Sequence, residues 1–170
     1  ETALFTQAFP GQSWTMLCKQ KKLMVPSQMY EICNFGENDL GEPAGTVTFL
    51  TRSSVSDSWS ALSQKDVTLP SGIEAYEYFG ESVAIDGDFA IIGAPGYQSE
   101  KGRAIIMRRS GDSWSPAHIL SEDDPGSEFG TDVAVDSAFG ETYFMVGAPG
   151  LYNEAGVVTI YRWDDVDSQA

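Results

Sequence analysis

Short runs of β-branched and other apolar residues alternate along the chain with clusters of Gly, Asp, Asn or Pro. This pattern is typical of short antiparallel strands, and helical periodicity is weak throughout. Asp86-Gly87-Asp88 tolerates positive φ and predicts a tight hairpin, whereas Pro95 has no backbone N–H and should end a strand. In the clearest region these signals predict strands over 82–86, 89–93, 102–109 and 114–120.

The predicted strands belong to a sequence repeat. Phe79-Gly80 recurs 50 residues later as Phe129-Gly130, and Gly93-Ala94-Pro95 recurs 54 residues later as Gly147-Ala148-Pro149. The four extra residues fall at 137–141, where we expect a hairpin tip. Two motifs that recur in a fixed order indicate one repeated supersecondary unit.

Glycine spacing predicts a first, degenerate repeat. Gly102 follows Gly93 by nine residues, and Gly156 follows Gly147 by the same interval. Gly36 and Gly45 are also nine residues apart, which places Gly36 at the position of Gly93. Ser-Trp pairs, which begin at residues 13, 58 and 113, are a further landmark. We therefore expect one domain over 1–170, with an N-terminal strand at 11–20, a degenerate first repeat at 21–59, a second at 60–120 and a third at 121–170.

The predicted fold class is all-β, with antiparallel four-stranded blades of the β-propeller type in three diverged repeats. Four strands in about 50 residues is the size of one blade. Small residues at Gly93-Ala94 and Gly147-Ala148 would let neighbouring blades pack closely, with phenylalanine rings between them. The last repeat stops after a third strand at 156–163. We expect segment 11–18 to complete a blade, either the last blade of its own chain or that of a neighbour.

Charge and hydropathy restrict the classes of partner that are expected. The 170 residues include 25 acidic and 10 basic side chains, for a formal net charge of −15. Such a charge opposes binding to a phosphate backbone, so no nucleic-acid partner is expected. The chain has no run of 18 apolar residues, so no membrane span is predicted.

Candidate catalytic chemistry is weak. Gly111-Asp112-Ser113 resembles the serine block of some hydrolases, but a serine nucleophile needs a histidine base within reach. The sole histidine, His118, lies five residues after Ser113 in one predicted strand, and this odd offset predicts opposite faces. Walker, HExxH and CxxC motifs are absent from the sequence, so we expect no enzyme.

Phe79-Gly80 through Gly93-Ala94-Pro95, and their counterparts at 129–149, resemble FG-GAP repeats, as in integrin alpha-subunit propellers. The resemblance implies four-stranded blades in an extracellular or cell-surface protein, with roles in adhesion, ligand binding or assembly. Calcium loops of that family are acidic, whereas loops 96–101 and 150–155 contain only Glu100 and Glu154, so no calcium site or other cofactor is carried over. An extracellular setting favours a disulfide between Cys18 and Cys33, and two buried thiols remain the alternative.

The resulting hypothesis is a non-catalytic, self-assembling structural repeat protein that associates head to tail with copies of itself. An alternative is an adhesion or carbohydrate-binding module, with glycans or surface proteins as partners and the loop aromatics Tyr97, Tyr152 and Trp163 facing the ligand. A third is a piece of a larger FG-GAP propeller. The Ser-Trp residues Trp59 and Trp114 are expected in the core rather than at a ligand.

Overall fold

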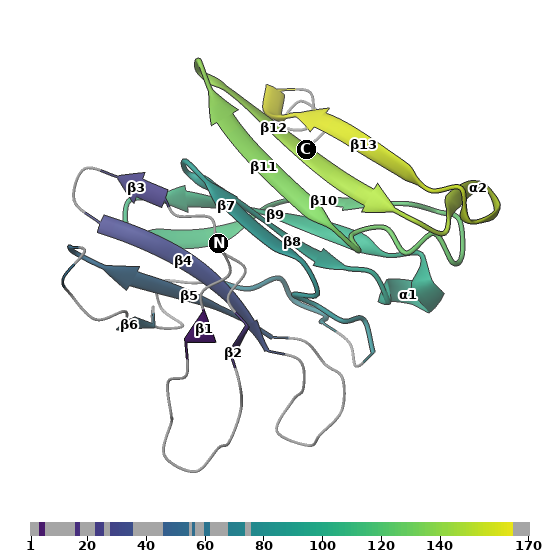
Figure 1. The fold of residues 1–170 in the computed structure, drawn as a ribbon, viewed down its shortest axis with the longest axis horizontal. Helices are drawn as coiled ribbons and strands as arrows, with labels where there is room; N and C mark the ends of the chain where they lie inside the picture. The colour runs from purple at the N-terminus through teal and green to yellow at the C-terminus, as the bar shows by residue number, and fades with distance from the viewer. Residues whose placement is uncertain are drawn as a thin grey trace, which may run out of the picture.

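Three antiparallel sheets follow one another along the chain (Figure 1). The structure is a computed structural model that describes the backbone of residues 4–5, 16–17, 23–25, 28–35, 46–54, 56, 60–61, 68–73 and 76–164, and side chains from residue 47 onward apart from Ala61. Within these ranges, no helix has the length and apolar character needed to cross a bilayer.

The first sheet has the order β1-β2-β4-β5-β6, and β3 also pairs with β4. Its two long strands are β4 and β5, which pair antiparallel. The bounds are β1 (Leu4–Phe5), β2 (Met16–Leu17), β3 (Leu23–Val25), β4 (Gln28–Phe35), β5 (Thr46–Arg52) and β6 (Ser60–Ala61).

The second sheet is a four-stranded meander with the order β10-β9-β8-β7. Its strands match the four predicted ones to within one residue at each end, and Gly87 has the positive φ (57°) expected of the hairpin. The bounds are β7 (Val83–Asp86), β8 (Phe89–Ala94), β9 (Arg103–Ser110) and β10 (Ser113–Ser121), with α1 (Tyr97–Glu100) between β8 and β9.

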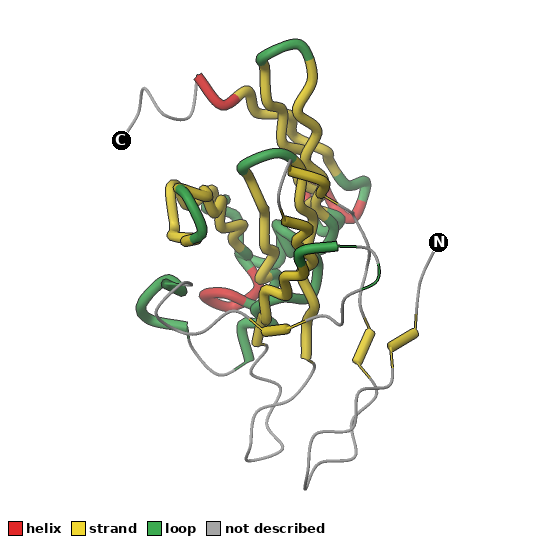
Figure 2. Tube along the Cα trace, turned by 90° about the vertical axis from the view of Figure 1, so that its left-hand side faces the viewer, coloured by secondary structure: helices red, strands yellow, loops and turns green. Residues whose placement is uncertain are grey.

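The third sheet repeats this plan with three strands in the described part of the chain, in the order β11-β12-β13. The four extra residues lie at the tip of the β11–β12 hairpin as predicted, and this tip stands at the top of Figures 1 and 2. The bounds are β11 (Val133–Ala138), β12 (Glu141–Ala148), α2 (Leu151–Glu154) and β13 (Val157–Arg162).

Two hydrophobic cores fill the spaces between consecutive sheets. Alternate side chains of one strand point to opposite faces, so the second sheet contributes to both cores. The core between the first two sheets includes Val47, Phe49, Phe79, Val83, Ile85, Ile92, Ile105, Met107 and Trp114. The core between the second and third sheets includes Ala84, Phe89, Ile91, Ala104, Ile106, Phe129, Val133, Val135, Phe144 and Val146.

The register of the first sheet corrects the glycine-spacing prediction. Gly93 pairs with Ala104 in the second sheet, and in the first sheet the residue that pairs with Val47 is Asn34. If Gly36 occupied the position of Gly93, it would pair with Val47 itself. The connection between β4 and β5 is therefore longer than the spacing implied, and Gly36 lies outside the described residues.

The N-terminal segment also departs from expectation within its own chain. Leu17 of β2 pairs with Asn34 of β4, so the described part of segment 11–18 belongs to the first sheet and not to the last. Elements that are consecutive in sequence usually lie next to one another in space, and β4 is much closer in sequence to this segment than the third sheet is. Donation to a neighbouring chain stays a prediction.

Candidate functional site

The Phe-Gly motif that opens each repeat places a phenylalanine ring between sheets. Phe79 is fully buried in the core shared with the first sheet, and Phe129 is fully buried in the core shared with the second. Phe129 also packs in a T-shaped arrangement with the Tyr161 ring, with centroids 6.5 Å apart. Each ring therefore fills the space toward the preceding sheet, as the repeat predicted.

Backbone hydrogen bonds join the two motifs within each repeat. The Gly80 N–H donates to the Gly93 carbonyl, and the Gly93 N–H donates to the Ser82 carbonyl, both at 2.8 Å. The third repeat has the same arrangement, since the Gly130 N–H donates to the Gly147 carbonyl at 2.9 Å. The sequence did not predict that the two motifs lie side by side.

Gly93 is the point where the backbone of the third repeat meets the second sheet. A Cβ atom at Gly93 would overlap the carbonyl oxygen of Gly130 and the hydroxyl of Ser82. The buried Ser82 Oγ donates to that same Gly130 carbonyl at 2.7 Å. Gly130 has a φ of 96°, a conformation that favours glycine. The predicted close packing at Gly93 is therefore confirmed. Ala94 and Ala148 are buried beside these glycines, and Pro95 and Pro149 follow them at the strand ends.

Hydrogen bonds also hold the third repeat to the second at both ends of the stacked strands. One end of the strands, where α1 and α2 lie, is called the loop end. There the Glu128 N–H donates to the Glu100 carbonyl at 2.8 Å, and Ser127 Oγ donates to the Lys101 carbonyl at 2.5 Å. At the opposite end, the Ser137 N–H donates to Asp86 Oδ2 at 2.6 Å. The interface therefore combines an apolar core with polar contacts at its rim.

Residues 63–105 match the model of the FG-GAP repeat family. This segment is similar to an FG-GAP repeat. The match includes β7, β8 and the start of β9, with Phe79-Gly80 and Gly93-Ala94-Pro95. FG-GAP repeats occur in extracellular proteins. No curated protein matches the chain. The all-β antiparallel sheets agree with blades of the FG-GAP propeller type.

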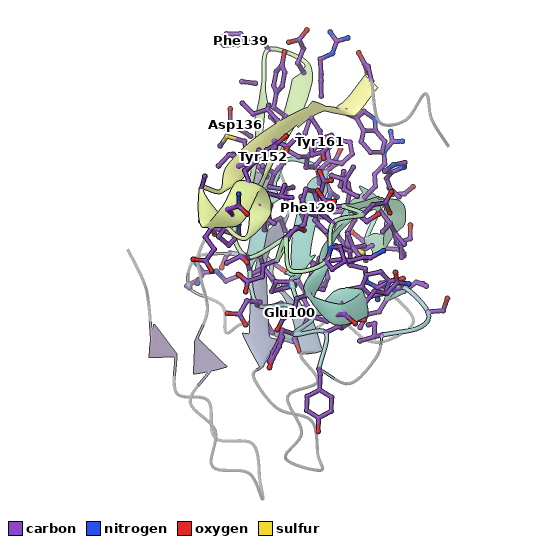
Figure 3. All side chains as sticks on the ribbon, turned by 90° about the vertical axis from the view of Figure 1, so that its right-hand side faces the viewer. Glu100, Phe129, Asp136, Phe139, Tyr152 and Tyr161 are labelled. Carbon is purple, nitrogen blue, oxygen red and sulfur yellow. The ribbon has the colours of Figure 1, made fainter. Side chains whose placement is uncertain are left out.

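A turn of left-handed backbone follows Gly93-Ala94-Pro95 in the second repeat, and another follows Gly147-Ala148-Pro149 in the third. In α1 the φ values of residues 98–100 are 46°, 61° and 63°, and in α2 those of residues 152–154 are 53°, 56° and 65°. None of these six residues is glycine, and the left-handed conformation costs about 1–2 kcal/mol per L-residue. Both turns lie at the same end of the molecule, near Glu100 and Tyr152 in Figure 3.

Acidic and tyrosine side chains line open hollows at this loop end. One hollow lies beside α2 and is lined in part by Glu100, Asp124, Glu128, Tyr152 and Glu154. Its counterpart beside α1 is lined by Tyr76, Glu77, Tyr78, Gly96, Gln98, Ser99 and Glu100. Among the residues with described side chains, no three of the His, Cys, Asp and Glu groups are placed to hold a metal ion.

The three loop aromatics do not form one surface. Tyr152 is largely exposed at the loop end, and Tyr97 is half-buried there with the Arg103 guanidinium 4.1 Å from its ring centroid. Trp163 lies at the other end, because β13 carries the chain away from α2, and its ring packs 4.7 Å from that of Phe89. The prediction that Trp163 faces a ligand with the two tyrosines is therefore wrong.

The Ser-Trp tryptophan of the second repeat is a core residue, as expected. Trp114 is buried, and its ring centroid lies 5.0 Å from that of Phe49 in the first sheet. Trp59 and Cys18 lie outside the described residues. Cys33 is in β4, where its backbone pairs with Thr48, and its disulfide with Cys18 stays a prediction.

A bulge in β10 corrects the faces assigned to Ser113 and His118. The register shifts between Pro116 and His118, so Ser113 pairs with Ser110 and His118 with Ile106. Both partners are even-numbered residues of β9, which puts the two side chains on one face. Four residues of β9 separate the pairs, about 13 Å at the usual rise per residue, which exceeds hydrogen-bonding distance.

A buried ion pair lies behind the left-handed turn of the second repeat. Arg103 Nη2 is 2.8 Å from Glu77 Oε1 and donates to the Gly72 carbonyl at 3.2 Å, and both charged side chains are buried. The third repeat has Ser127 and Val157 at the equivalent positions. No sequence pattern predicted this pair, because its members lie 26 residues apart and the third repeat has neither charge.

The phenol of Tyr161, on β13, has a raised pKa. Burial raises the pKa of the Tyr161 phenol above 10.0, the negative charge of Glu122 raises it further, and a hydrogen bond with Thr159 acts in the opposite direction. Tyr161 packs against the second core, so its phenol remains protonated over the physiological range.

Proposed function

We propose that this chain is a non-catalytic structural repeat protein of the extracellular space or cell surface, in which FG-GAP blades stack in series into a propeller-type scaffold. One observation carries the proposal: the residues that recur between repeats are used for contacts between sheets. Phe129 and Gly130 contact the second sheet directly, and Gly93 is small because Gly130 lies against it.

The test compares a stacking residue with an exposed loop residue. Phe129→Ala removes a fully buried ring and should lower the free energy of unfolding by about 3–5 kcal/mol. Tyr152→Ala should leave that free energy within about 0.5 kcal/mol of wild type, because its side chain is largely exposed. Urea denaturation followed by tryptophan fluorescence measures both. A glycan or surface-protein ligand whose binding is lost in Tyr152→Ala would overturn the purely structural role.

Ligand binding at the loop end is a second candidate. The exposed side chains of Tyr76, Tyr78 and Tyr152 favour it, since tyrosine combines a flat apolar ring with a hydrogen-bonding hydroxyl. Screening the chain against a glycan array, with Tyr152→Ala as the matched variant, tests this candidate.

Self-association of separate chains is a third, and the exposed apolar residues of the third sheet favour it. Sedimentation velocity over a range of concentrations measures association directly. Ile160→Asp should weaken it, whereas Ile119→Asp, at an exposed isoleucine of the second sheet, should not. A chain that is monomeric at every concentration excludes self-assembly and leaves stacking within one polypeptide.

A further inference from the structure

The third sheet exposes the residues that correspond to the covered face of the second. In the second sheet Ala84, Phe89, Ile91, Ala104 and Ile106 are buried against the third sheet. The equivalent residues of the third sheet are Ala134, Tyr143, Met145, Val158 and Ile160, which we call the outer face. Four of them are exposed, Tyr143 at 40%, Met145 at 42%, Val158 at 65% and Ile160 at 63%. The outer face thus has an apolar or aromatic side chain at every position where its counterpart is buried.

Gly147 independently indicates that a backbone segment packs on the outer face. Its counterpart Gly93 is small because the Gly130 carbonyl of the next repeat lies against it. At Gly147 nothing comparable is present, since the nearest atom to a Cβ would be the Asp132 carbonyl oxygen at 3.6 Å. The φ of Gly147 is not positive, so the backbone does not require glycine either. Glycine within a strand costs roughly 0.5–1 kcal/mol relative to alanine. A backbone carbonyl arriving at the outer face would give this glycine the role that Gly93 has.

The polar groups at the rim of the outer face correspond to those that bind the third repeat on the second sheet. Asp86 accepts the Ser137 N–H of the next repeat, and its counterpart Asp136 is an exposed carboxylate at the same place in β11. The carbonyls of Glu100 and Lys101 accept hydrogen bonds from the third repeat, and those of Glu154 and Ala155 hold the equivalent positions. An occupant with the backbone of a blade would find the same acceptors.

One position differs and restricts the chemistry of the occupant. Ser82 donates its hydroxyl to the incoming Gly130 carbonyl, but the equivalent residue of the third repeat is Asp132. Asp132 Oδ1 accepts the Val133 N–H at 3.1 Å, and an ionised carboxylate has no proton to donate. A carbonyl placed against Asp132 would be repelled unless the occupant also supplied a hydrogen-bond donor.

A second copy of the chain fits the outer face less well than a further blade does. Its third sheet has the same acidic residue and the same outer face, and Leu50 of its first sheet is already buried. The net charge of −15 also opposes contact between copies.

We propose that the outer face binds one further FG-GAP-type blade, placed after β13 as the third sheet is placed after β10, and that this blade carries a hydrogen-bond donor opposite Asp132. The inference rests on the proposed stacking role and names its next partner. The Phe-Gly motif of that blade would lie against Gly147, and its inner strand would donate a backbone N–H to Asp136.

A tandem chain tests the proposal within one molecule. Residues 111–164 are added again after Asp164, which continues the 54-residue spacing and supplies both a fourth strand for the third sheet and a complete Phe-Gly motif. The readout is the rate at which hydrogen peroxide oxidises Met145, a solvent-exposed thioether in the natural chain. Trypsin separates the two copies, because Arg162 is the only lysine or arginine in the added segment, so the methionine of the terminal copy is an exposed reference.

Three tandem variants give distinct expectations. With Asp132→Ser, which restores the hydroxyl of Ser82, oxidation of Met145 should fall severalfold relative to the terminal copy. With Asp132 retained, protection should be weaker, because the added blade brings no donor. With Asp132→Ser and Gly147→Ala together, protection should be lost, although Gly147→Ala should not destabilise the natural chain.

Two outcomes would overturn the proposal. One is full oxidation of Met145 in the Asp132→Ser tandem chain and also in a second tandem chain whose added blade carries residues 79–110 in place of 129–164. The other is protection that Gly147→Ala does not change. Protection of Met145 by self-association of the natural chain would assign the face to a second copy instead. Loss of blade docking leaves the Phe129→Ala test unaffected, so the two proposals can fail separately.

Discussion

Gly93→Ala should be strongly destabilising although it adds a single methyl group. The new Cβ would overlap the Gly130 carbonyl oxygen and the Ser82 hydroxyl. The hydroxyl can rotate away, but it then gives up its 2.7 Å hydrogen bond to Gly130, a loss of about 1 kcal/mol. The carbonyl is backbone and can move only if the third sheet shifts, and such overpacking costs roughly 1–3 kcal/mol.

Replacing a strand glycine by alanine also has a favourable part. Alanine restricts the unfolded chain and contributes roughly 0.5–1 kcal/mol in a strand. The net loss expected for Gly93→Ala is therefore about 2 kcal/mol. Urea denaturation, followed by the fluorescence of Trp114 and Trp163 on the two sides of the second sheet, measures it.

Gly147→Ala is the matched control, since it makes the same change in the same motif one repeat later. A Cβ there would have its nearest neighbour at 3.6 Å, an ordinary van der Waals distance. We expect a stability equal to wild type or higher by up to about 1 kcal/mol. Equal effects at Gly93 and Gly147 would refute the view that contact with Gly130 is what requires a glycine.

Three further predictions concern single sites. Glu77→Ser should lower the unfolding free energy by about 3–5 kcal/mol, because it leaves the Arg103 charge buried and unpaired. Adding Arg103→Val gives the residue pair found in the third repeat and should recover much of the lost stability. Urea denaturation measures both variants. Because the Tyr161 pKa is raised above 10.0, the folded chain holds the phenolic proton more tightly than the unfolded chain. The resulting stability is present below pH 10 and falls as pH rises above it. Denaturation at pH 9 and 11 should show this decline in wild type, and less of it in Tyr161→Phe. Phe139 is fully exposed with a φ of 55°, so Phe139→Gly should raise the melting temperature, by an amount corresponding to about 1 kcal/mol. A lower melting temperature would mean that the ring has a packing role.

The sequence predicted the strands of the second sheet closely because local signals agreed there. Short apolar runs, the glycine of the Asp86–Asp88 turn and the strand-ending Pro95 all point to the same boundaries. The first sheet was harder to predict, because one glycine interval was its main guide and the β4–β5 connection has a different length. Spacing along a chain fixes register only when the connecting loop keeps its length.

The candidate site was likewise predictable from the sequence only in part. Repetition identified Phe79, Phe129 and Gly93, but not the residues that act between repeats, such as Ser82. Its hydroxyl bonds to a carbonyl 48 residues away, and the third repeat has aspartate at that position. Likewise, the bulge that brings Ser113 and His118 to one face depends on pairing with β9, which a two-residue period cannot reveal.

The four extra residues of the third repeat have a structural consequence of their own. They lengthen β11 and β12 beyond β7 and β8, so that Ser137 reaches the hairpin turn of the second sheet. There its N–H bonds to Asp86, and its side chain would be 3.2 Å from a Cβ at Gly87. The same extension raises Phe139 to the top of the molecule (Figure 3). The insertion therefore connects the third sheet to the second through Asp86. The equivalent Asp136 of the third sheet is exposed at the outer face, so one face of this sheet is covered by the second sheet and the other is not.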